Sequence, residues 1–383
     1  MIYLDSAATT PIRREVLDAM WPYLTGEFGN PSSHHALGER AAKALADARA
    51  RIAQCLGCRT SEIVFTSGGT EADNLAIKGI ALAAPRGRHI IATPIEHEAV
   101  LESCDYLRRH HNFEITFVPV DRYGLIDVQA FEAALREDTT LCTVMLANNE
   151  VGTIQPVAQL AQLAHAHNVP IHTDAVQAAG ALDIDVKSLG VDAMSLSGHK
   201  LGAPKGIGAL FLRGRLHAEP VLHGGGQERG RRSGTENVAG AVGLARALEI
   251  ATASLFERMQ RLSALRDELI RGVLSAVPDA VLTGHPTQRL PGSASFCFPG
   301  TSGEAVLLQL EERGILCSSG SACAAGSDDP SHVLLAMGVA PAIAQTAVRF
   351  TLSDAITAEQ VATTVRAVVE GCLAIRSIAA VHP

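Results

Sequence analysis

Short apolar runs alternate with longer amphipathic segments along the first two thirds of the chain. Helical spacing of the apolar positions predicts helices at 12–24 and 34–56, the second rich in alanine. Runs of strand length occur at 62–66, 89–92, 115–119, 140–147, 171–173, 193–196 and 209–212. This alternation is typical of βαβ units, so we predict an α/β fold with a mainly parallel central sheet flanked by helices.

The pattern changes in the last third of the chain. A long helical stretch runs from 238 to 271, and short apolar runs follow at 280–283, 294–298 and 348–352. Mixed with helical segments, these runs predict a smaller α+β domain. We therefore expect an N-terminal segment (1–14) that packs with the small domain, a large domain (15–255) and a small C-terminal domain (256–383). A length of 383 residues supports two cores, because single cores stop growing at roughly 250–300 residues.

The net charge and the cysteine pattern limit the binding partners and the cellular compartment that we expect. The net charge is −8, and no basic run is present, which disfavours nucleic acid and an anionic membrane surface as partners. No apolar stretch reaches the ~18 residues of a membrane span, and the N-terminus does not resemble a signal peptide. The eight cysteines are scattered and do not resemble a disulfide framework. We expect a protein of the reducing cytoplasm.

A turn-rich connection at 197–206 joins two of the apolar runs and contains Lys200. A lysine held between buried strands loses hydration, which lowers its pKa and suits an amine that forms a Schiff base with a carbonyl. Ser197 and His199 could donate hydrogen bonds to a phosphate beside it. A single lysine in a loop is more often simply solvated. Other parts of the chain must therefore decide between a Schiff-base lysine and a solvated one.

Two other strand ends offer ligand-binding chemistry. Glycines in the turn 67–70 precede a helix, where free N–H groups bind phosphate, although Thr70 could simply cap that helix. Asp174 follows an apolar run, at the position where open sheets bind ligands. It could pair with a protonated ring nitrogen, with Gln177 facing the same ligand, or it could cap the next helix.

The remaining candidates are individually weaker. His97 could stack on a planar cofactor and move protons, or be a structural histidine. The loop 222–237 is an anion site or a solvated basic loop. Cys323 lies in a flexible loop where a thiolate is accessible, whereas Cys317 is expected to be buried and inert. Arg349 could hold a substrate carboxylate or form a surface pair. The CxxC at 55–58 is interpreted as a helix end.

Several motifs together carry a resemblance to a known family. They are SGGTEADN, EHEAV, NNEVGTIQP, HTDAVQ, SGHKLGAPKGIG, GGGQERGRRSGTEN and SSGSACAAG. The chain resembles the pyridoxal-phosphate-dependent cysteine desulfurases of the class V aminotransferases, in the branch that serves nitrogenase and general iron–sulfur cluster assembly. The match runs from Tyr3 to about Leu352. It implies the fold type I of pyridoxal-phosphate-dependent transferases.

The resemblance implies a role for each candidate around the cofactor ring. Lys200 would hold pyridoxal 5'-phosphate as a Schiff base, Asp174 would pair with the ring nitrogen, and His97 would stack on the ring. Asn149 and Gln177 would contact the ring oxygen.

It also implies the phosphate and substrate contacts. The phosphate would be bound by Gly69, Thr70, Ser197 and His199, with Thr235 supplied by the other subunit of a homodimer. Arg349, helped by Asn30, would bind the carboxylate of L-cysteine.

The implied reaction converts L-cysteine to L-alanine. Lys200 would remove the α-proton, and His97 is the candidate for removing the substrate thiol proton. A Cys323 thiolate would attack the substrate sulfur and become a persulfide. The sulfur would then pass to an acceptor such as an iron–sulfur scaffold protein. No resident metal is expected, although Cys323 is a candidate transient cluster ligand. Ala-Ala-Gly follows Cys323 where the family often has Thr or Ser, which could alter loop motion or acceptor choice.

Three alternatives remain at this point. A fold-type-I aminotransferase would keep Lys200, Asp174 and the phosphate site but needs no mobile thiol. A selenocysteine lyase would use the same scaffold. A sulfur-carrier or assembly scaffold without catalysis is disfavoured because Lys200, Asp174 and Cys323 are present together.

Overall fold

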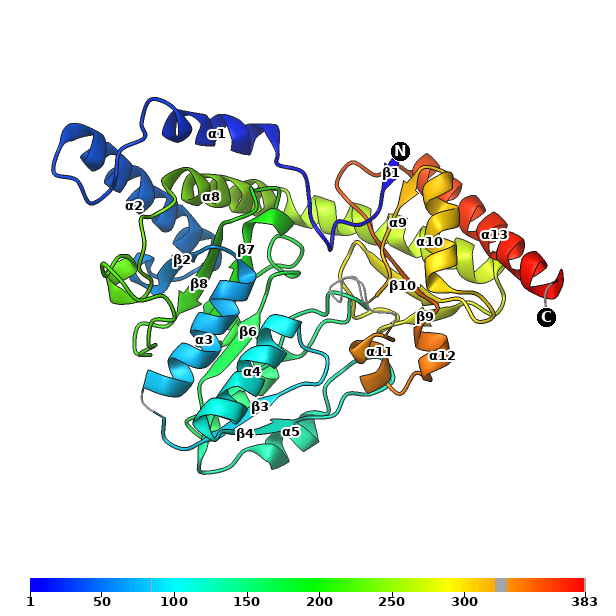
Figure 1. Ribbon diagram of the computed structural model, residues 1–383, viewed down its shortest axis with the longest axis horizontal. Helices are drawn as coiled ribbons and strands as arrows, with labels where there is room; N and C mark the ends of the chain where they lie inside the picture. Colours follow the sequence, from blue (N-terminus) through cyan, green and yellow to red (C-terminus); the bar gives the residue numbers. More distant parts are fainter. Residues whose placement is uncertain (84, 321–328, 382–383) are drawn as a thin grey trace.

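The computed structural model describes residues 1–83, 85–320 and 329–381. Its centre is a seven-stranded sheet in the order β2-β8-β7-β6-β5-β3-β4 (Figure 1). The strands are β2 (Ile63–Thr66), β3 (His89–Ala92), β4 (Glu114–Phe117), β5 (Thr139–Thr143), β6 (Ile171–Asp174), β7 (Ala193–Ser197) and β8 (Gly208–Leu212). Strand β8 runs antiparallel to both of its neighbours, β2 and β7, and the other strand pairs described in this sheet are parallel. The predicted mainly parallel sheet is confirmed, but the expected strand at 140–147 is too long, since β5 ends at Thr143.

Helices cover both faces of this sheet (Figure 1). They are α1 (Arg14–Leu24), α2 (Ala36–Leu56), α3 (Gly69–Ala83), α4 (Glu98–His111), α5 (Val128–Ala134), α6 (Val157–Ala166), α7 (Val186–Leu189) and α8 (Val238–Ala253). Along β2 the side chains alternate between two cores. Ile63 and Phe65 pack on the side of α2 and α8, and Val64 packs on the side of α3 and α4. Strands buried on both faces explain the continuous apolar runs of the sequence.

The CxxC at 55–58 lies at a helix end, as predicted. Helix α2 ends at Leu56, and Gly57 follows with φ 71°, the left-handed conformation that glycine adopts at helix ends. Burial raises the pKa of the Cys58 thiol to about 12.

A second, smaller domain follows a break in the long helical stretch. Helix α8 ends at Ala253, and α9 (Leu255–Ala276) leaves it at an angle of 71°. The single helical stretch expected at 238–271 is therefore two helices. The reason is packing, because α8 is buried in the large core whereas α9 packs one face on the small core. No single helix in the described part of the chain is long and apolar enough to cross a membrane, and only the bent pair α8–α9 passes that test together.

The small domain is built on a three-stranded antiparallel sheet in the order β12-β10-β9. Its elements are β9 (Val281–Thr283), β10 (Ser293–Cys297), α10 (Gly303–Glu312), α11 (His332–Ala336), α12 (Pro341–Ala344), β12 (Ala347–Thr351) and α13 (Ala358–Val381). Phe296, Phe298 and Phe350 lie in its own core. This agrees with the expected α+β pattern.

The N-terminal segment connects the two domains. Strand β1 (Ile2–Tyr3) pairs in parallel with β11 (Ile315–Leu316), and Asp5 forms a bridge to Thr351 of β12. A few residues later, the Thr10 hydroxyl donates to the carbonyl of His199 at 2.7 Å. The segment thus runs from the small domain to the large one. The precise domain limits at 14 and 255 stay a prediction.

Candidate functional site

Polar side chains from several loops meet in a cavity of about 320 Å³ at the carboxyl edge of the large sheet. Its lining brings together most of the site residues predicted from the sequence: Gly69, Thr70, His97, Asn149, Asp174, Gln177, Ser197, His199, Lys200 and Arg349. Parallel strands end at one edge of a sheet, and this topology collects residues that are far apart in the chain.

Lys200 lies in a short 3-10 turn, Gly198–Lys200, directly after β7. Its ammonium donates hydrogen bonds to the carbonyl oxygens of Ala7 and, at 2.7 Å, of Ala8. The lysine is therefore recessed between the sheet and the N-terminal segment and is not a solvated loop residue. This placement satisfies the requirement for a partly desolvated amine.

Asp174 is the last residue of β6, as the sequence indicated, and its side chain is buried. One carboxylate oxygen accepts from the backbone N–H of Val176 at 2.8 Å. Burial raises the pKa of Asp174, and the nearby His97 and Lys200 act in the opposite direction. A buried carboxylate of this kind is stabilised by a cationic partner, which a protonated pyridine nitrogen would provide.

A second buried carboxyl, that of Asp73, lines the same cavity and was missed by the sequence analysis. Burial, followed by the charge of Asp174, raises its pKa well above the usual range. Its Oδ1 has no hydrogen-bond partner among the described residues. Only the TEADN motif signalled this residue, and a lone aspartate in a helix carries no spatial information.

The turn before α3 has the close approach that a phosphate cradle needs. A Cβ added to Gly69 would lie 2.7 Å from Cγ2 of Val176, so a side chain there would displace the turn against the wall of the cavity. His199 lines the same cavity, and burial, with the charges of Lys200 and Lys205, lowers its pKa to about 4. It is therefore neutral at pH 7. Its Nδ1 lies 3.1 Å from the Thr9 hydroxyl.

The arginines of the loop 222–237 are engaged within the chain. Arg232 pairs with Glu71 at the start of α3 at 2.9 Å. Arg229 and Arg231 donate to backbone carbonyls of Ser61, and Arg229 also to that of Ile63. Arg229 is exposed, and Arg231 and Arg232 are half-buried. The interpretation of this loop as an anion site or as a solvated basic loop stays a prediction.

His97 combines a structural contact with a place in the cavity. It precedes α4, and its Nδ1 accepts from the backbone N–H of Ala99 at 3.1 Å. The ring lines the cavity together with Asp174 and Lys200. His97 can therefore be both a structural histidine at the start of α4 and a residue that acts in the cavity.

Arg349 is not a surface residue. It lies in the middle of β12, and its side chain is only 2% exposed. Nη2 pairs with Asp5 at 2.9 Å, and Nη1 donates to the carbonyl of Asn149 at 3.1 Å. Nε has no hydrogen-bond partner among the described residues. Because Arg349 lines the cavity, its guanidinium can face a carboxylate that is bound there. The partner Asp5 was not predicted.

Two predicted residues, Asn30 and Thr235, do not line this cavity. Asn30 and Thr235 are exposed, and Asn30 accepts a hydrogen bond from the backbone N–H of Ser32 at 2.9 Å. Cys323 lies outside the described residues. Before it in the chain, Cys317 is half-buried, and burial raises the pKa of its thiol to about 12. Cys317 is therefore an inert thiol, as expected.

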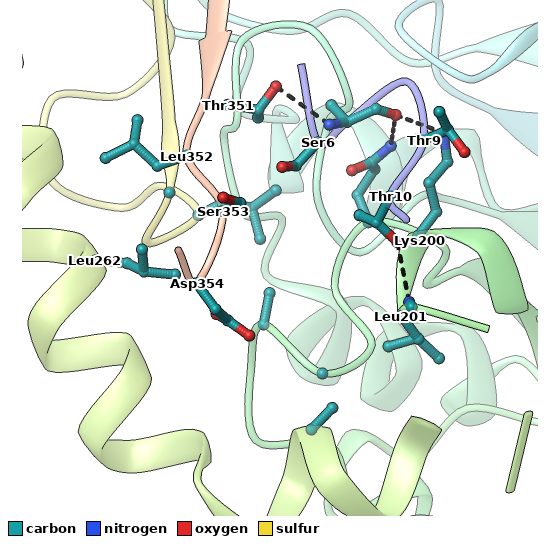
Figure 2. A pocket seen from close by; sticks show the side chains of 18 of the residues that line it. Ser6, Thr9, Thr10, Lys200, Leu201, Leu262, Thr351, Leu352, Ser353 and Asp354 are labelled. Atoms are coloured by element: carbon teal, nitrogen blue, oxygen red, sulfur yellow. Dashed lines mark hydrogen bonds between the residues drawn. The ribbon is translucent and has the colours of Figure 1, made fainter. Parts of the chain in front are cut away.

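A larger cavity of about 720 Å³ lies next to the first and shares Ala7, Gln177 and Lys200 with it. Figure 2 shows the N-terminal segment with Ser6, Thr9 and Thr10 beside Lys200, opposite Leu352 and Asp354 of the small domain. Hydrogen bonds fix this segment, including one from the Ala7 N–H to the Thr351 hydroxyl at 3.2 Å. Lys200 thus lies at the junction of both cavities.

Comparison with known proteins identifies relatives that agree with one another in family and in fold. The family described as aminotransferase class-V matches residues 2–363. A cysteine desulfurase IscS of Methanosarcina thermophila is 47% identical over 383 residues, covering 100% of this chain and 94% of that protein. A solved structure described as a NifS-like protein superposes with a TM-score of 0.90 at 39% identity, covering 96% of this chain and 98% of the other.

A second solved structure, described as SspA in complex with cysteine, is 38% identical with a TM-score of 0.79 and covers 92% of this chain and 99% of that one. Together with the α/β architecture, these neighbours confirm the fold that the resemblance implied.

Proposed function

Because the chain belongs to the pyridoxal-phosphate-dependent cysteine desulfurases of the class-V aminotransferase family, we propose that it converts L-cysteine to L-alanine and retains the sulfur as a persulfide on Cys323. One observation carries this proposal. A recessed lysine, a buried strand-end aspartate and a buried arginine line a single cavity, although Lys200, Asp174 and Arg349 are far apart in the chain.

The cavity fits pyridoxal 5'-phosphate. The turn at Gly69 leaves room for a phosphate, with Thr70, Ser197 and His199 around it, and Asp174 offers a buried carboxylate for the ring nitrogen. When bound, this cofactor supplies an electron sink that weakens bonds at the substrate α-carbon.

The residues of the chain divide the remaining tasks. Arg349 lines the cavity and holds the substrate carboxylate through its guanidinium. Lys200 reaches the cavity from the side of the N-terminal segment and moves the α-proton. His97, with the ring in the cavity, accepts the substrate thiol proton. Asn149 and Gln177 also line the cavity and would contact the ring oxygen of the cofactor.

Sulfur leaves the substrate by attack of the Cys323 thiolate. The new S–S bond forms as the substrate Cβ–S bond breaks, and the electron pair of that bond stays on carbon. The carbon then takes up a proton to give alanine. The persulfide sulfur is afterwards available to a thiol acceptor. We expect this acceptor to be a protein of iron–sulfur cluster assembly or another thiolation system.

We further propose a cytoplasmic homodimer. The seven cysteines that the structure describes are free thiols, which agrees with a reducing compartment. Asn30 and Thr235 are exposed on this chain and outside its own cavity. They are therefore available to complete a partner's site.

The test is product formation from L-cysteine with a thiol reductant, for the wild type and for Cys323→Ala. We expect both proteins to show the visible absorbance of the bound cofactor, and only the wild type to release alanine and sulfide. Full activity of Cys323→Ala would show that Cys323 is not the nucleophile.

Two further experiments test whether another cysteine is the nucleophile and whether the protein has a different activity. Cys317→Ala should retain full activity, because a buried thiol with a pKa of about 12 cannot replace Cys323. Assays with L-selenocysteine, and with an amino acid plus a 2-oxo acid, distinguish a selenocysteine lyase and an aminotransferase. We expect L-cysteine to be turned over faster than L-selenocysteine and no amino transfer to occur.

A further inference from the structure

The carboxylate of Asp5 lies between two parts of the site that are distant in sequence. Its Oδ1 pairs with Nη2 of Arg349 at 2.9 Å, and its Oδ2 accepts from the Ser318 hydroxyl at 2.7 Å. The Asp5 side chain is itself only 16% exposed. One carboxylate therefore connects a buried guanidinium with the strand end that precedes residues 321–328.

The backbone strengthens this arrangement. The Arg349 N–H donates to the Ser318 carbonyl at 2.7 Å, and Asp5 bridges to Thr351 on the same strand. The segments that contain Asp5 and Ser318 are thus both joined by backbone contacts to β12, the strand that contains Arg349. A displacement of one of these three residues is therefore transmitted to the other two.

Arg349 needs such support because its guanidinium is long and almost fully buried. On one side Nη1 donates to the Asn149 carbonyl at 3.1 Å. Without Asp5, the contact of Nη1 with the neutral Asn149 carbonyl would remain, and the buried guanidinium would lose the carboxylate that pairs with it. A guanidinium that binds a carboxylate must be held in a fixed position, because the geometry of its N–H donors determines how well the carboxylate is bound.

We propose that Asp5 is a positioning residue for substrate binding: it fixes the Arg349 guanidinium and aligns it with Ser318. This inference rests on the proposed role of Arg349 in holding the substrate carboxylate. The Asp5 carboxylate acts through Arg349 and does not touch the substrate. Its contribution belongs to binding of the amino acid and not to the chemical step.

The experiment compares Asp5→Ala and Asp5→Asn with the wild type in steady-state kinetics on L-cysteine. Asn retains a side-chain oxygen for Arg349 and an amide that can bond to the Ser318 hydroxyl, but it removes the charge. We expect Asp5→Ala to raise KM about 10-fold with kcat within about twofold, as expected for an interaction lost equally in ground and transition states. Asp5→Asn should raise KM only about threefold.

A second readout measures binding without turnover. The product L-alanine carries the same carboxylate, and its dissociation constant can be followed by the change in cofactor absorbance. We expect this constant to rise in step with KM for both Asp5 variants. The cofactor content of the isolated proteins should equal that of the wild type.

Tyr3→Phe is the matched control in the same segment. The Tyr3 hydroxyl donates to the Asp5 and Thr9 carbonyls, at 3.0 and 2.7 Å, so its removal loosens the segment without touching Arg349. We expect KM to stay within about twofold of the wild type. If Tyr3→Phe matched Asp5→Ala, general ordering of the segment would explain the effect, and the proposal would be wrong.

Two other outcomes also overturn it. An unchanged KM in Asp5→Ala would show that Arg349 is held without Asp5. A lower KM would show that Asp5 competes with the substrate for Arg349. Arg349→Ala separates this inference from the proposed function. A large rise of its KM, together with a normal KM in Asp5→Ala, would reject only the role of Asp5.

Discussion

Glu96 carries a carboxyl group that the fold keeps away from water. Both of its carboxyl oxygens accept from the Met145 N–H at 3.0 Å, and Oε1 also accepts from the Thr93 hydroxyl at 2.7 Å. Burial raises the pKa of Glu96 to about 8, against an ordinary value of 4.5. In the folded protein this group is therefore protonated at neutral pH. Its hydrogen bonds hold Glu96, the residue before His97, to the backbone of Met145 just after β5.

This raised pKa makes stability depend on pH. Between pH 4.5 and 8 the unfolded chain loses the Glu96 proton while the folded chain keeps it, so the free energy of unfolding falls as pH rises. Glu96→Gln removes that titration and keeps an acceptor oxygen. We expect the difference in stability between wild type and variant to change with pH by up to about 1.4 kcal/mol per unit in this window. Urea unfolding at pH 5, 6, 7 and 8 measures it.

Glu102→Gln is the control, because Glu102 lies on the next helix but its side chain is largely exposed. Its unfolding curves should follow the pH dependence of the wild type. Parallel curves for wild type and Glu96→Gln would mean that Glu96 titrates normally.

At the residue scale, motifs identified single side chains but not their partners. Lys200, Asp174 and Arg349 were found because each occurs in a recognisable local sequence. The pairing of Arg349 with Asp5 joins positions 344 residues apart, and no local pattern encodes such a contact. The same holds for the carbonyls of Ala7 and Ala8 that receive the Lys200 ammonium.

At the element scale, prediction succeeded where burial is uniform along an element. Strands β3, β7 and β8 of the large sheet are buried along their whole length, so their apolar runs are continuous and their positions were found closely. The break between α8 and α9 was missed because both helices have helical periodicity. The chain bends at Ser254 where the helix leaves one core for another. Only the assembled cores determine that point.

The end of α2 provides an element-scale prediction. Gly57 has φ 71°, and an added Cβ would lie 2.1 Å from Oδ2 of Asp185. That carboxylate caps α7 through the backbone N–H groups of Lys187 and Ser188. Gly57→Ala must therefore strain the turn and displace a cap, and we expect it to lower the free energy of unfolding by about 2–3 kcal/mol. Urea denaturation measures the change.

Gly338→Ala isolates the cost of the backbone conformation. Gly338 also follows a short helix and has φ 81°, but an added Cβ would meet nothing within 4 Å. We expect a loss of only about 1 kcal/mol. Equal losses in both variants would mean that the contact with Asp185 relaxes without cost.

At the scale of the whole molecule, one end of the large domain exposes apolar side chains. Trp21 and Leu24 in α1 and Phe28 in the loop that follows are exposed, and Asn30 is two residues further on. Helices α1 and α2 form the end of the molecule opposite α13 (Figure 1). A second copy of this chain would cover these side chains, and the proposed homodimer places its interface where Asn30 can approach the partner's site.

Phe28→Asp tests this surface. Phe28 is 68% exposed in the single chain, so a charge there leaves the fold intact, whereas a charge inside an interface loses hydration. We expect the dimer dissociation constant to rise at least 30-fold, which corresponds to about 2 kcal/mol. Sedimentation equilibrium measures it. Cofactor retention should fall with the dimer fraction, because Thr235 is expected to complete the phosphate site of the other subunit.

Phe256→Asp is the matched substitution on α9, where the phenylalanine is 86% exposed. It lies in the first turn after the α8–α9 break and outside the exposed apolar segment 21–28, so its dimer should dissociate as the wild type does. A Phe28→Asp protein that remains fully dimeric would place the interface elsewhere. If both variants dissociated, the effect would follow from added charge in general. We expect only the Phe28→Asp dimer to dissociate, with cofactor released as the subunits separate. That result would show that cofactor binding in the cavity depends on an interface at the exposed apolar end of the large domain.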